Sequence, residues 1–325
     1  MRQPPEHIHG AGWTARPIPT GTLAGMLRAY FDTTVPSWIV DGLVPAEDVA
    51  ALKAAFMRGD LIAPIGPVIL DELVGELEKD RDAMIRKLKL LRDFGTFHGM
   101  LKQPADILRE AIQTYAEGRE PPTVTLPEDQ RRALVRVLAD VIAGSRRYEA
   151  SLTEVFGGVT ELKLGWLTHR QEAHQETQSY EPWQRVRSEV SSRSVPFPVS
   201  FARGAVDFAL AGAEPLGLAD ACRQRGVEGL ISLPVIRLAA GVSLAQMYAE
   251  LVGSQGQPRK PDRKDGYDLW HAILASTANL FVTFDKRLAD HVERIPDLQT
   301  PRIVRSIKEL LGIVRRVSGI SSDTN

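Results

Sequence analysis

Short apolar runs typical of β-strands alternate with helical patterns near both ends of this chain. Leu27–Thr33 and Asp60–Ile65 lie near the amino terminus, and Leu280–Phe284 and Pro301–Val304 lie near the carboxyl terminus. Strands that are separated by helices pair in parallel, because each helix carries the chain back to the edge where the previous strand began. The alternation therefore predicts an α/β fold with a central parallel β-sheet flanked by helices. A further run, Gly229–Val235, is expected to add a strand.

The middle of the chain differs from its two ends. Between residues 96 and 229 helical patterns dominate, and strand patterns are few. We therefore expect an α/β domain made of two distant pieces and interrupted by a long, mainly α-helical insertion. The predicted organisation is a flexible tail at 1–26, an α/β domain formed by 27–95 and 230–316, a helical insertion at 96–229, and a disordered tail at 317–325. Within the first piece, a helix is expected to open at Val68 and to run on as far as Phe94.

Composition excludes several classes of protein. The 325 residues have a formal net charge of -1, so any basic surface that attracts nucleic acid must be local. Cys222 is the only cysteine, which excludes an intramolecular disulfide and a cysteine-based zinc cluster. The sequence has no apolar run long enough to span a membrane, and its first residues lack the apolar core of a signal peptide. We expect a cytoplasmic protein without a membrane partner.

Four acidic residues are predicted to lie near one edge of the sheet. Asp32 ends the first strand, and Glu72 lies in the helix after the second strand. Asp268 lies at the start of the helix that precedes the run Leu280–Phe284, and Asp285 directly follows that run. Ligands of open α/β sheets bind at the carboxyl ends of the strands. Because hard cations prefer carboxylate oxygens, the four acids predict a Mg²⁺ or Mn²⁺ site.

Neighbouring acids and ordinary structural roles leave alternatives open. Asp71 is an alternative to Glu72 as a metal ligand, and Asp265 is an alternative to Asp268. An acid at the start of a helix also serves as an N-cap, which is a structural explanation for Asp268. Asp285, directly after a buried run, has the weakest structural explanation of the four acids.

Three segments resemble the acidic motifs of the PIN-domain ribonuclease family. They are FDTTVPSWIV from Phe31, PVILDEL from Pro67, and DLWHAILASTANLFVTFDKRL from Asp268. Members of this family are small α/β folds with a central parallel sheet, and they use three or four acids to bind Mg²⁺ or Mn²⁺ and cleave RNA. The resemblance covers roughly residues 27–95 and 265–312, and the segment between them is far longer than in a minimal PIN toxin.

The resemblance implies a site and an activity. The catalytic and metal-binding acids would be Asp32, Glu72, Asp268 and Asp285, and the Thr283 hydroxyl would orient a carboxylate or a metal-bound water. The implied activity is that of a metal-dependent endoribonuclease of PIN type, which is compatible with the toxin of a toxin–antitoxin or defence system. The implied partner is RNA, single-stranded or structured, and the family also allows an antitoxin-like protein or a second copy of the chain.

Basic residues come just before the third acid in the sequence. They are Arg259, Lys260, Arg263 and Lys264, in a segment rich in glycine, proline and charge that is expected to be a loop. Cationic side chains beside an acid cluster are well placed to hold the phosphates of a nucleic acid. We therefore expect this loop to bind the substrate backbone.

Two other functions are compatible with parts of the sequence. The first is a catalytically weak PIN-like module that binds RNA or a protein through the helical insertion. The second starts from FDTTV, which also looks like the nucleophile strand of haloacid-dehalogenase-type phosphatases, although Thr34 occupies the position where that family carries a second acid. A glycine-rich dinucleotide or P-loop signature is absent from the sequence, so nucleotide-dependent chemistry has no support.

Overall fold

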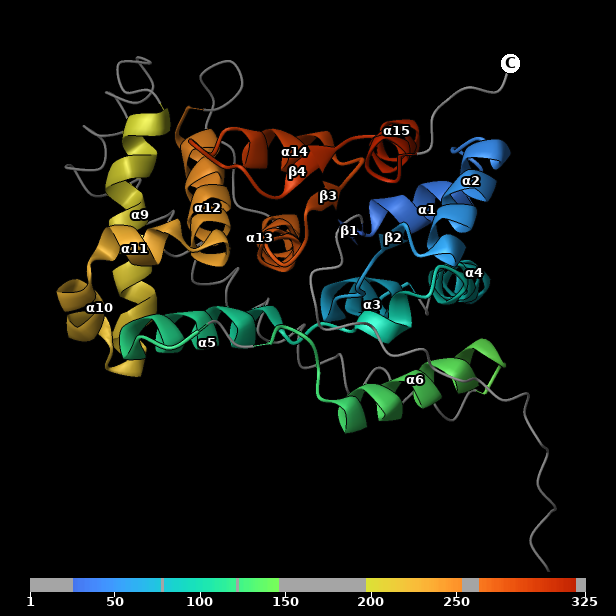
Figure 1. The fold of residues 1–325 in the computed structure, drawn as a ribbon, viewed down its shortest axis with the longest axis horizontal. Coiled ribbons are helices and arrows are strands. Elements are labelled where there is room, and N and C mark those ends of the chain that lie inside the picture. The colour runs from blue at the N-terminus through green and yellow to red at the C-terminus, as the bar shows by residue number, and fades with distance from the viewer. Residues whose placement is uncertain (1–25, 77–78, 121–122, 146–196, 253–262, 320–325) are drawn as a thin grey trace, which may run out of the picture.

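The computed structural model describes residues 26–76, 79–120, 123–145, 197–252 and 263–319. Over these residues the chain is mainly helical and contains a small four-stranded sheet (Figure 1). The strands are β1 (Leu27–Phe31), β2 (Leu61–Ile62), β3 (Leu280–Val282) and β4 (Arg302–Val304). All three strand pairs are parallel and the order is β2-β1-β3-β4, so the prediction of an α/β fold with a parallel sheet is confirmed.

The helices connect and surround this sheet. The first half of the chain contributes α1 (Thr34–Val40), α2 (Ala46–Arg58), α3 (Pro67–Val74), α4 (Arg81–Asp93), the short 3₁₀ helix η1 (Thr96–Gly99), α5 (Pro104–Glu117) and α6 (Glu128–Ile142). The second half contributes α9 (Phe197–Ala213), η2 (Glu214–Leu216), α10 (Ala219–Arg225), α11 (Val227–Ser232), α12 (Pro234–Val252), α13 (Arg263–Ala275), α14 (Lys286–Glu293) and α15 (Ile307–Val317).

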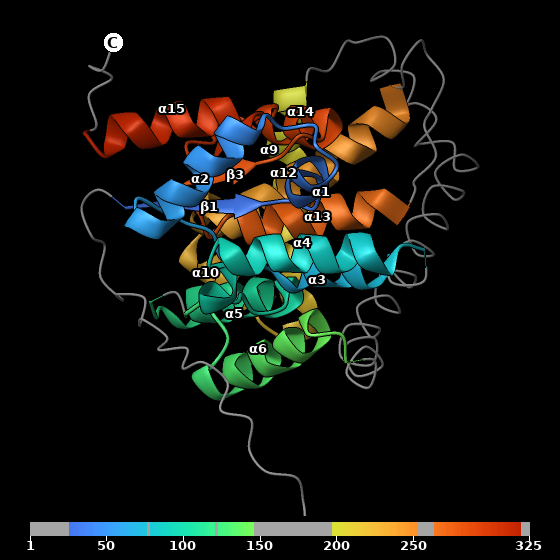
Figure 2. The same ribbon diagram turned by 90° about the vertical axis from the view of Figure 1, so that its right-hand side faces the viewer.

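Side chains of the two central strands alternate between two hydrophobic clusters. Tyr30 and Phe281, which pair across β1 and β3, point into a cluster with α3 and α13. Their neighbours Phe31 and Val282 point into the other cluster, with α2 and α15. This period of two is what a strand that is buried on both faces requires. The sheet is thus the middle of three layers, with α15 and α2 on one side and α13, α3 and α4 on the other (Figure 2).

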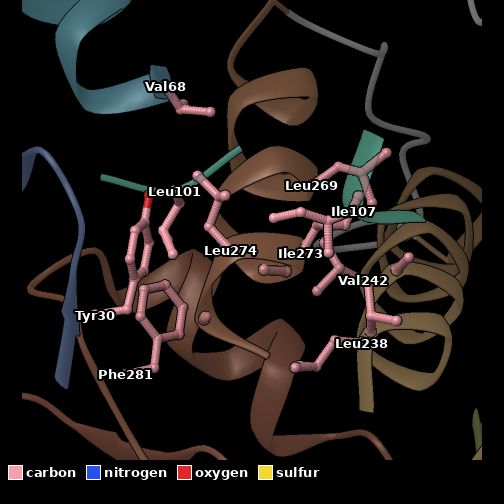
Figure 3. Packing of buried hydrophobic residues seen from close by; sticks show 14 of the residues in the cluster. Tyr30, Val68, Leu101, Ile107, Leu238, Val242, Leu269, Ile273, Leu274 and Phe281 are labelled. Atoms are coloured by element: carbon pink, nitrogen blue, oxygen red, sulfur yellow. The ribbon is translucent and has the colours of Figure 1, made fainter. Parts of the chain in front are cut away.

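The cluster on the Tyr30 face extends well beyond the sheet. It is continuous from Tyr30 and Phe281 to Ile107 of α5 and to Leu238 and Val242 of α12 (Figure 3). Helices from the predicted insertion therefore share a hydrophobic core with the sheet. The segment that is expected to be helical, 96–229, contains η1, α5, α6, α9, η2, α10 and the first half of α11 among its described residues.

Three elements differ from the sequence prediction. The run Gly229–Val235 is helical and not a strand, because α11 covers its first part and α12 begins at Pro234. The second strand is shorter than Asp60–Ile65, since only Leu61 and Ile62 pair with β1. The helix from Val68 to Phe94 is two helices, because α3 ends before Gly75 and Asp80 caps a new helix by accepting the Ala83 N–H at 2.8 Å.

The two predicted tails fall mainly outside the described residues. Residues 1–25 and 320–325 are not described, and α15 ends at Val317, one residue beyond the predicted domain limit. Across the described ranges, none of the helices is both long enough and apolar enough to cross a bilayer.

Candidate active site

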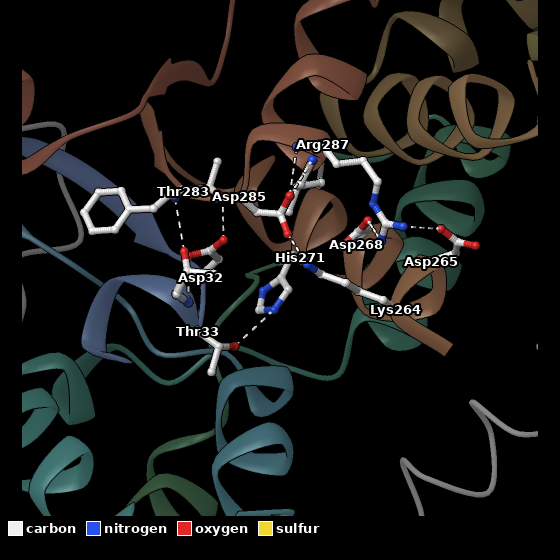
Figure 4. A network of polar contacts seen from close by, with 12 residues as sticks. Asp32, Thr33, Lys264, Asp265, Asp268, His271, Thr283, Asp285 and Arg287 are labelled. Carbon is white, nitrogen blue, oxygen red and sulfur yellow. Dashed lines mark hydrogen bonds and ion pairs between the residues drawn. The ribbon is translucent and has the colours of Figure 1, made fainter. Parts of the chain in front are cut away.

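The carboxyl ends of β1 and β3 bring together acids that are far apart in the sequence. The backbone N–H of Asp32 donates to the Val282 carbonyl at 3.1 Å, which extends the pairing of the two strands by one residue. The Thr283 hydroxyl donates to the Asp32 carboxylate and accepts the backbone N–H of Asp285 at 3.1 Å. One hydroxyl therefore joins Asp32 and Asp285 at the predicted edge of the sheet (Figure 4).

Asp32 is a buried carboxylate held by hydroxyl and amide donors. Only 2% of the residue is exposed. Besides Thr283, its donors are the backbone N–H and the hydroxyl of Thr34, at 3.0 and 2.5 Å. Burial raises the pKa of Asp32 above its ordinary value, although the nearby His271 and these hydroxyls act in the opposite direction. The ionised form of Asp32 therefore needs further positive charge nearby.

Glu72 reaches the same region from α3. Its carboxylate accepts the Thr33 hydroxyl and lies 2.9 Å from Nε2 of the buried His271, which α13 contributes. Nδ1 of His271 lies 2.8 Å from the Tyr30 hydroxyl. Burial alone would lower the pKa of His271, but the Glu72 carboxylate raises it above its ordinary value. A protonated imidazole can donate to Glu72 and to Tyr30 at once, and so it fixes the position of the carboxylate.

The alternative acid Asp71 points to a different partner. The Tyr267 hydroxyl donates to its carboxylate at 3.0 Å, so Asp71 joins α3 to α13. Adjacent residues on a helix do not share a face, which explains why Glu72 meets His271 while its neighbour does not. Glu72 is therefore the acid of α3 that bonds Thr33, which lies just after β1.

Replacing Tyr30 with Phe is expected to lower the free energy of unfolding by about 1–3 kcal/mol, because the fully buried hydroxyl bonds the buried His271. Urea denaturation at neutral pH measures the change. Tyr115→Phe is the matched control: its hydroxyl bonds the Gly226 carbonyl in a partly buried position, so the loss should be about 1 kcal/mol or less. A Tyr30→Phe protein as stable as the wild type would contradict this account of the His271 bond.

Asp268 and Asp265 share a basic partner on α14. Arg287 Nη2 donates to Asp268 at 2.8 Å, and Nη1 lies 3.5 Å from a carboxylate oxygen of Asp265. Helix α13 begins at Arg263, so Asp268 lies in its second turn and the prediction that it starts or caps the helix is wrong. Burial raises the pKa of Asp268 to about 7, with Arg287 acting against the shift and Asp285 adding to it. The negative charge of Asp285 thus disfavours ionisation of Asp268.

Asp285 has a structural role as well as a place in the cluster. It is the N-cap of α14, and its carboxylate accepts the backbone N–H groups of Arg287 and Leu288 at 2.8 and 3.2 Å. Lys264 forms an ion pair with the same carboxylate. Although partial burial acts in the opposite direction, Lys264 and the helix N–H groups lower the pKa of Asp285. The expectation that Asp285 is the acid least easily explained by structure is therefore wrong, because it caps α14.

The predicted phosphate-binding residues are only partly described. Arg259 and Lys260 lie outside the described residues, and Arg263 is the first residue of α13. Lys264 also belongs to α13 and not to a loop, and its side chain is 57% exposed while it pairs with Asp285. Lys264 therefore places a cationic side chain at the rim of the acid cluster.

The side chains of the cluster carry oxygen atoms, which are the ligands that a hard divalent cation prefers. The oxygen atoms belong to carboxylates and hydroxyls, and five acids (Asp32, Glu72, Asp265, Asp268 and Asp285) outnumber the three basic side chains Lys264, His271 and Arg287. Burial raises the pKa values of Asp32 and Asp268, so a bound cation would stabilise their ionised forms. Within the described ranges no three acid, imidazole or thiol groups are placed close enough to hold an ion as they stand. Binding would require the ion pairs of Lys264 and Arg287 to open.

Comparisons with known proteins add nothing to this geometry: no protein-family model, no curated protein and no solved structure matches the chain. The chemistry of the acid cluster must therefore be inferred from its own residues.

Proposed function

We propose that this protein is a metal-dependent ribonuclease of PIN type. The observation that carries this proposal is the convergence of Asp32, Glu72, Asp268 and Asp285 on one edge of a parallel sheet, from residues far apart along the chain. Ordinary stability does not require a cluster of buried and partly buried acids, because carboxylates of like charge repel one another. A cluster that needs cations and lies at the carboxyl ends of parallel strands is typical of a functional site.

The four acids would hold Mg²⁺ or Mn²⁺. Bound there, the cation would supply Lewis-acid stabilisation of the charge on the phosphodiester group. The chain's own residues would keep the ligands in place: the Thr283 hydroxyl orients Asp32, and His271 orients Glu72. When Lys264 and Arg287 release their carboxylates, their charges would remain beside the site and attract a phosphate of the RNA backbone.

Metal dependence is the first test. Purified protein is expected to cleave a labelled single-stranded RNA with Mn²⁺ or Mg²⁺, to lose cleavage in EDTA, and to regain it when metal is added in excess. In parallel, Mn²⁺ at about 100 times its dissociation constant should stabilise the folded state by about 2.7 kcal/mol, measured as a rise in the thermal midpoint. Cleavage that persists in EDTA, or a chain that shows neither cleavage nor a thermal shift, would contradict the proposal.

A second function is favoured by the ion pairs in the same cluster. Lys264 pairs with Asp285, Arg287 with Asp268 and His271 with Glu72, so three of the four acids already have a counter-charge. A module that keeps these pairs would bind RNA or a protein with weak catalysis or none. It would bind RNA without a Mn²⁺-induced thermal shift, and this result distinguishes it from the nuclease.

A further inference from the structure

An exposed tryptophan lies against an aromatic residue of the site. Trp38 on α1 is 42% exposed, and its ring lies 4.8 Å from that of Phe284, centroid to centroid, at an interplanar angle of 49°. The other exposed large hydrophobic residues in the described part of the chain are aliphatic: Leu43, Met57, Met247 and Val317. Trp38 thus presents an aromatic surface to solvent while Phe284 supports it from below.

The aromatic pair is joined directly to the acid cluster. Phe284 immediately precedes Asp285, and its backbone N–H donates to the Thr34 hydroxyl at 3.0 Å. The same hydroxyl donates to Asp32. Trp38 lies four residues after Thr34 on α1, and positions four apart share one face of a helix. The exposed indole is therefore about one helical turn from the residue that holds the first acid.

We propose that Trp38, supported by Phe284, is a subsite that stacks an unpaired nucleobase next to the phosphodiester group bound by the acids. This subsite presupposes the nuclease activity proposed above and restricts its substrate to a strand with an unpaired base at this position. Every base has a face that stacks on an aromatic ring, so the subsite tolerates different sequences. A base within a duplex already has its faces covered by its neighbours, so a paired strand cannot use the subsite without being opened.

Residues from two elements make the position of the subsite well defined. The hydroxyl of Thr34 connects α1 to the segment after β3, so Trp38 and Phe284 are held relative to Asp32 by the same contacts that hold the acid. A stacked base would therefore be fixed beside the site, as productive positioning of the phosphodiester group requires. The cationic Lys264 at the rim would contact the phosphate and not the base.

The test is a comparison of RNA affinities in a protein that cannot cleave. In an Asp285→Asn background with Mn²⁺, the fluorescence anisotropy of a labelled single-stranded RNA gives the dissociation constant. Trp38→Ala is expected to weaken binding between about 5-fold and 100-fold, the range of a single aromatic–base stack. Trp38→Phe keeps an aromatic ring and should recover most of the affinity, which separates stacking from a loss of folding. Met57 is 76% exposed and lies in the last turn of α2. The control substitution Met57→Ala should therefore leave the affinity unchanged.

RNA in which single bases are removed shows which base stacks on Trp38. An RNA that lacks the stacked base should bind as weakly as intact RNA binds Trp38→Ala, and Trp38→Ala should not weaken it further. If wild-type protein cleaves RNA and Trp38→Ala keeps its affinity, or if duplex RNA binds better than single strands, the subsite is overturned while the nuclease proposal stands. If wild-type protein neither binds nor cleaves RNA, both proposals fail.

Discussion

Replacing Asp285 with Asn is expected to reduce Mn²⁺-dependent RNA cleavage by about 100-fold or more while leaving the fold intact. The substitution removes a negative charge that a divalent cation would need, and loss of even a supporting contact at a metal site costs about 10-fold to 100-fold. Asn retains an oxygen that accepts the N–H groups of Arg287 and Leu288, and it is as good an N-cap as Asp. The ion pair between Lys264 and this carboxylate is lost, but the Lys264 side chain is largely accessible to water. Single-turnover cleavage rates and thermal melting together measure the two effects.

Asp290→Asn is the matched control for this substitution. Asp290 lies on the same helix, α14, and its exposed carboxylate pairs with Arg305 at 2.7 Å. Removing an exposed ion pair changes stability by about 1 kcal/mol at most, and cleavage should be unaffected. Full cleavage by Asp285→Asn would remove Asp285 from the site, and equal losses in both variants would point to a general effect of charge on RNA binding.

Much of the sheet could be predicted because its strands are short, apolar and separated by strong helix signals. Gly59, with a φ of 78°, ends α2 in the left-handed conformation that favours glycine, and β1, β3 and β4 all lie within the predicted runs. The prediction of a strand at Gly229–Val235 is wrong because a short apolar segment has no periodicity that separates a buried helix from a strand. Pro234 was the overlooked signal, since proline is favoured in the first turn of a helix, and α12 begins there.

The acids could be predicted from their positions at strand ends, but their partners could not. Arg287 reads in the sequence as an exposed helix residue, and only the fold, which brings its side chain to α13, shows that it meets Asp268. Tyr30 fits the pattern of a buried strand residue in β1. Its hydrogen bond to His271, which lies 241 positions away, cannot be predicted from the residues around it. The sequence favours Asp285 as the acid least easily explained by structure because the helix that it caps begins within the same motif. Pairings over such distances depend on the tertiary fold, which a local pattern does not contain.

Replacing Asp268 with Asn is expected to stabilise the metal-free protein at pH 8 while it abolishes cleavage. Burial raises the pKa of Asp268 from 3.8 to about 7, so between these values the folded protein holds a proton that the unfolded chain has released. Stability therefore falls as the pH rises through this window, and above pH 7 the buried charge has its full cost. At 1.36 kcal/mol for each pKa unit the cost is roughly 4 kcal/mol at most.

The Asn variant avoids this cost, and its side-chain oxygen can still accept the Arg287 hydrogen bond. We expect a gain of about 1–3 kcal/mol in the free energy of unfolding at pH 8 in EDTA and little difference near pH 4, where the wild-type carboxyl group is protonated in the folded state. Urea denaturation at the two pH values measures both. Excess Mn²⁺ at pH 8 should make the wild type more stable than the variant, because a bound cation neutralises the buried carboxylate only in the wild type. A wild-type protein that is more stable than the variant at pH 8 without metal would show that Arg287 alone neutralises Asp268, and the cluster would then have no need of a cation at this position.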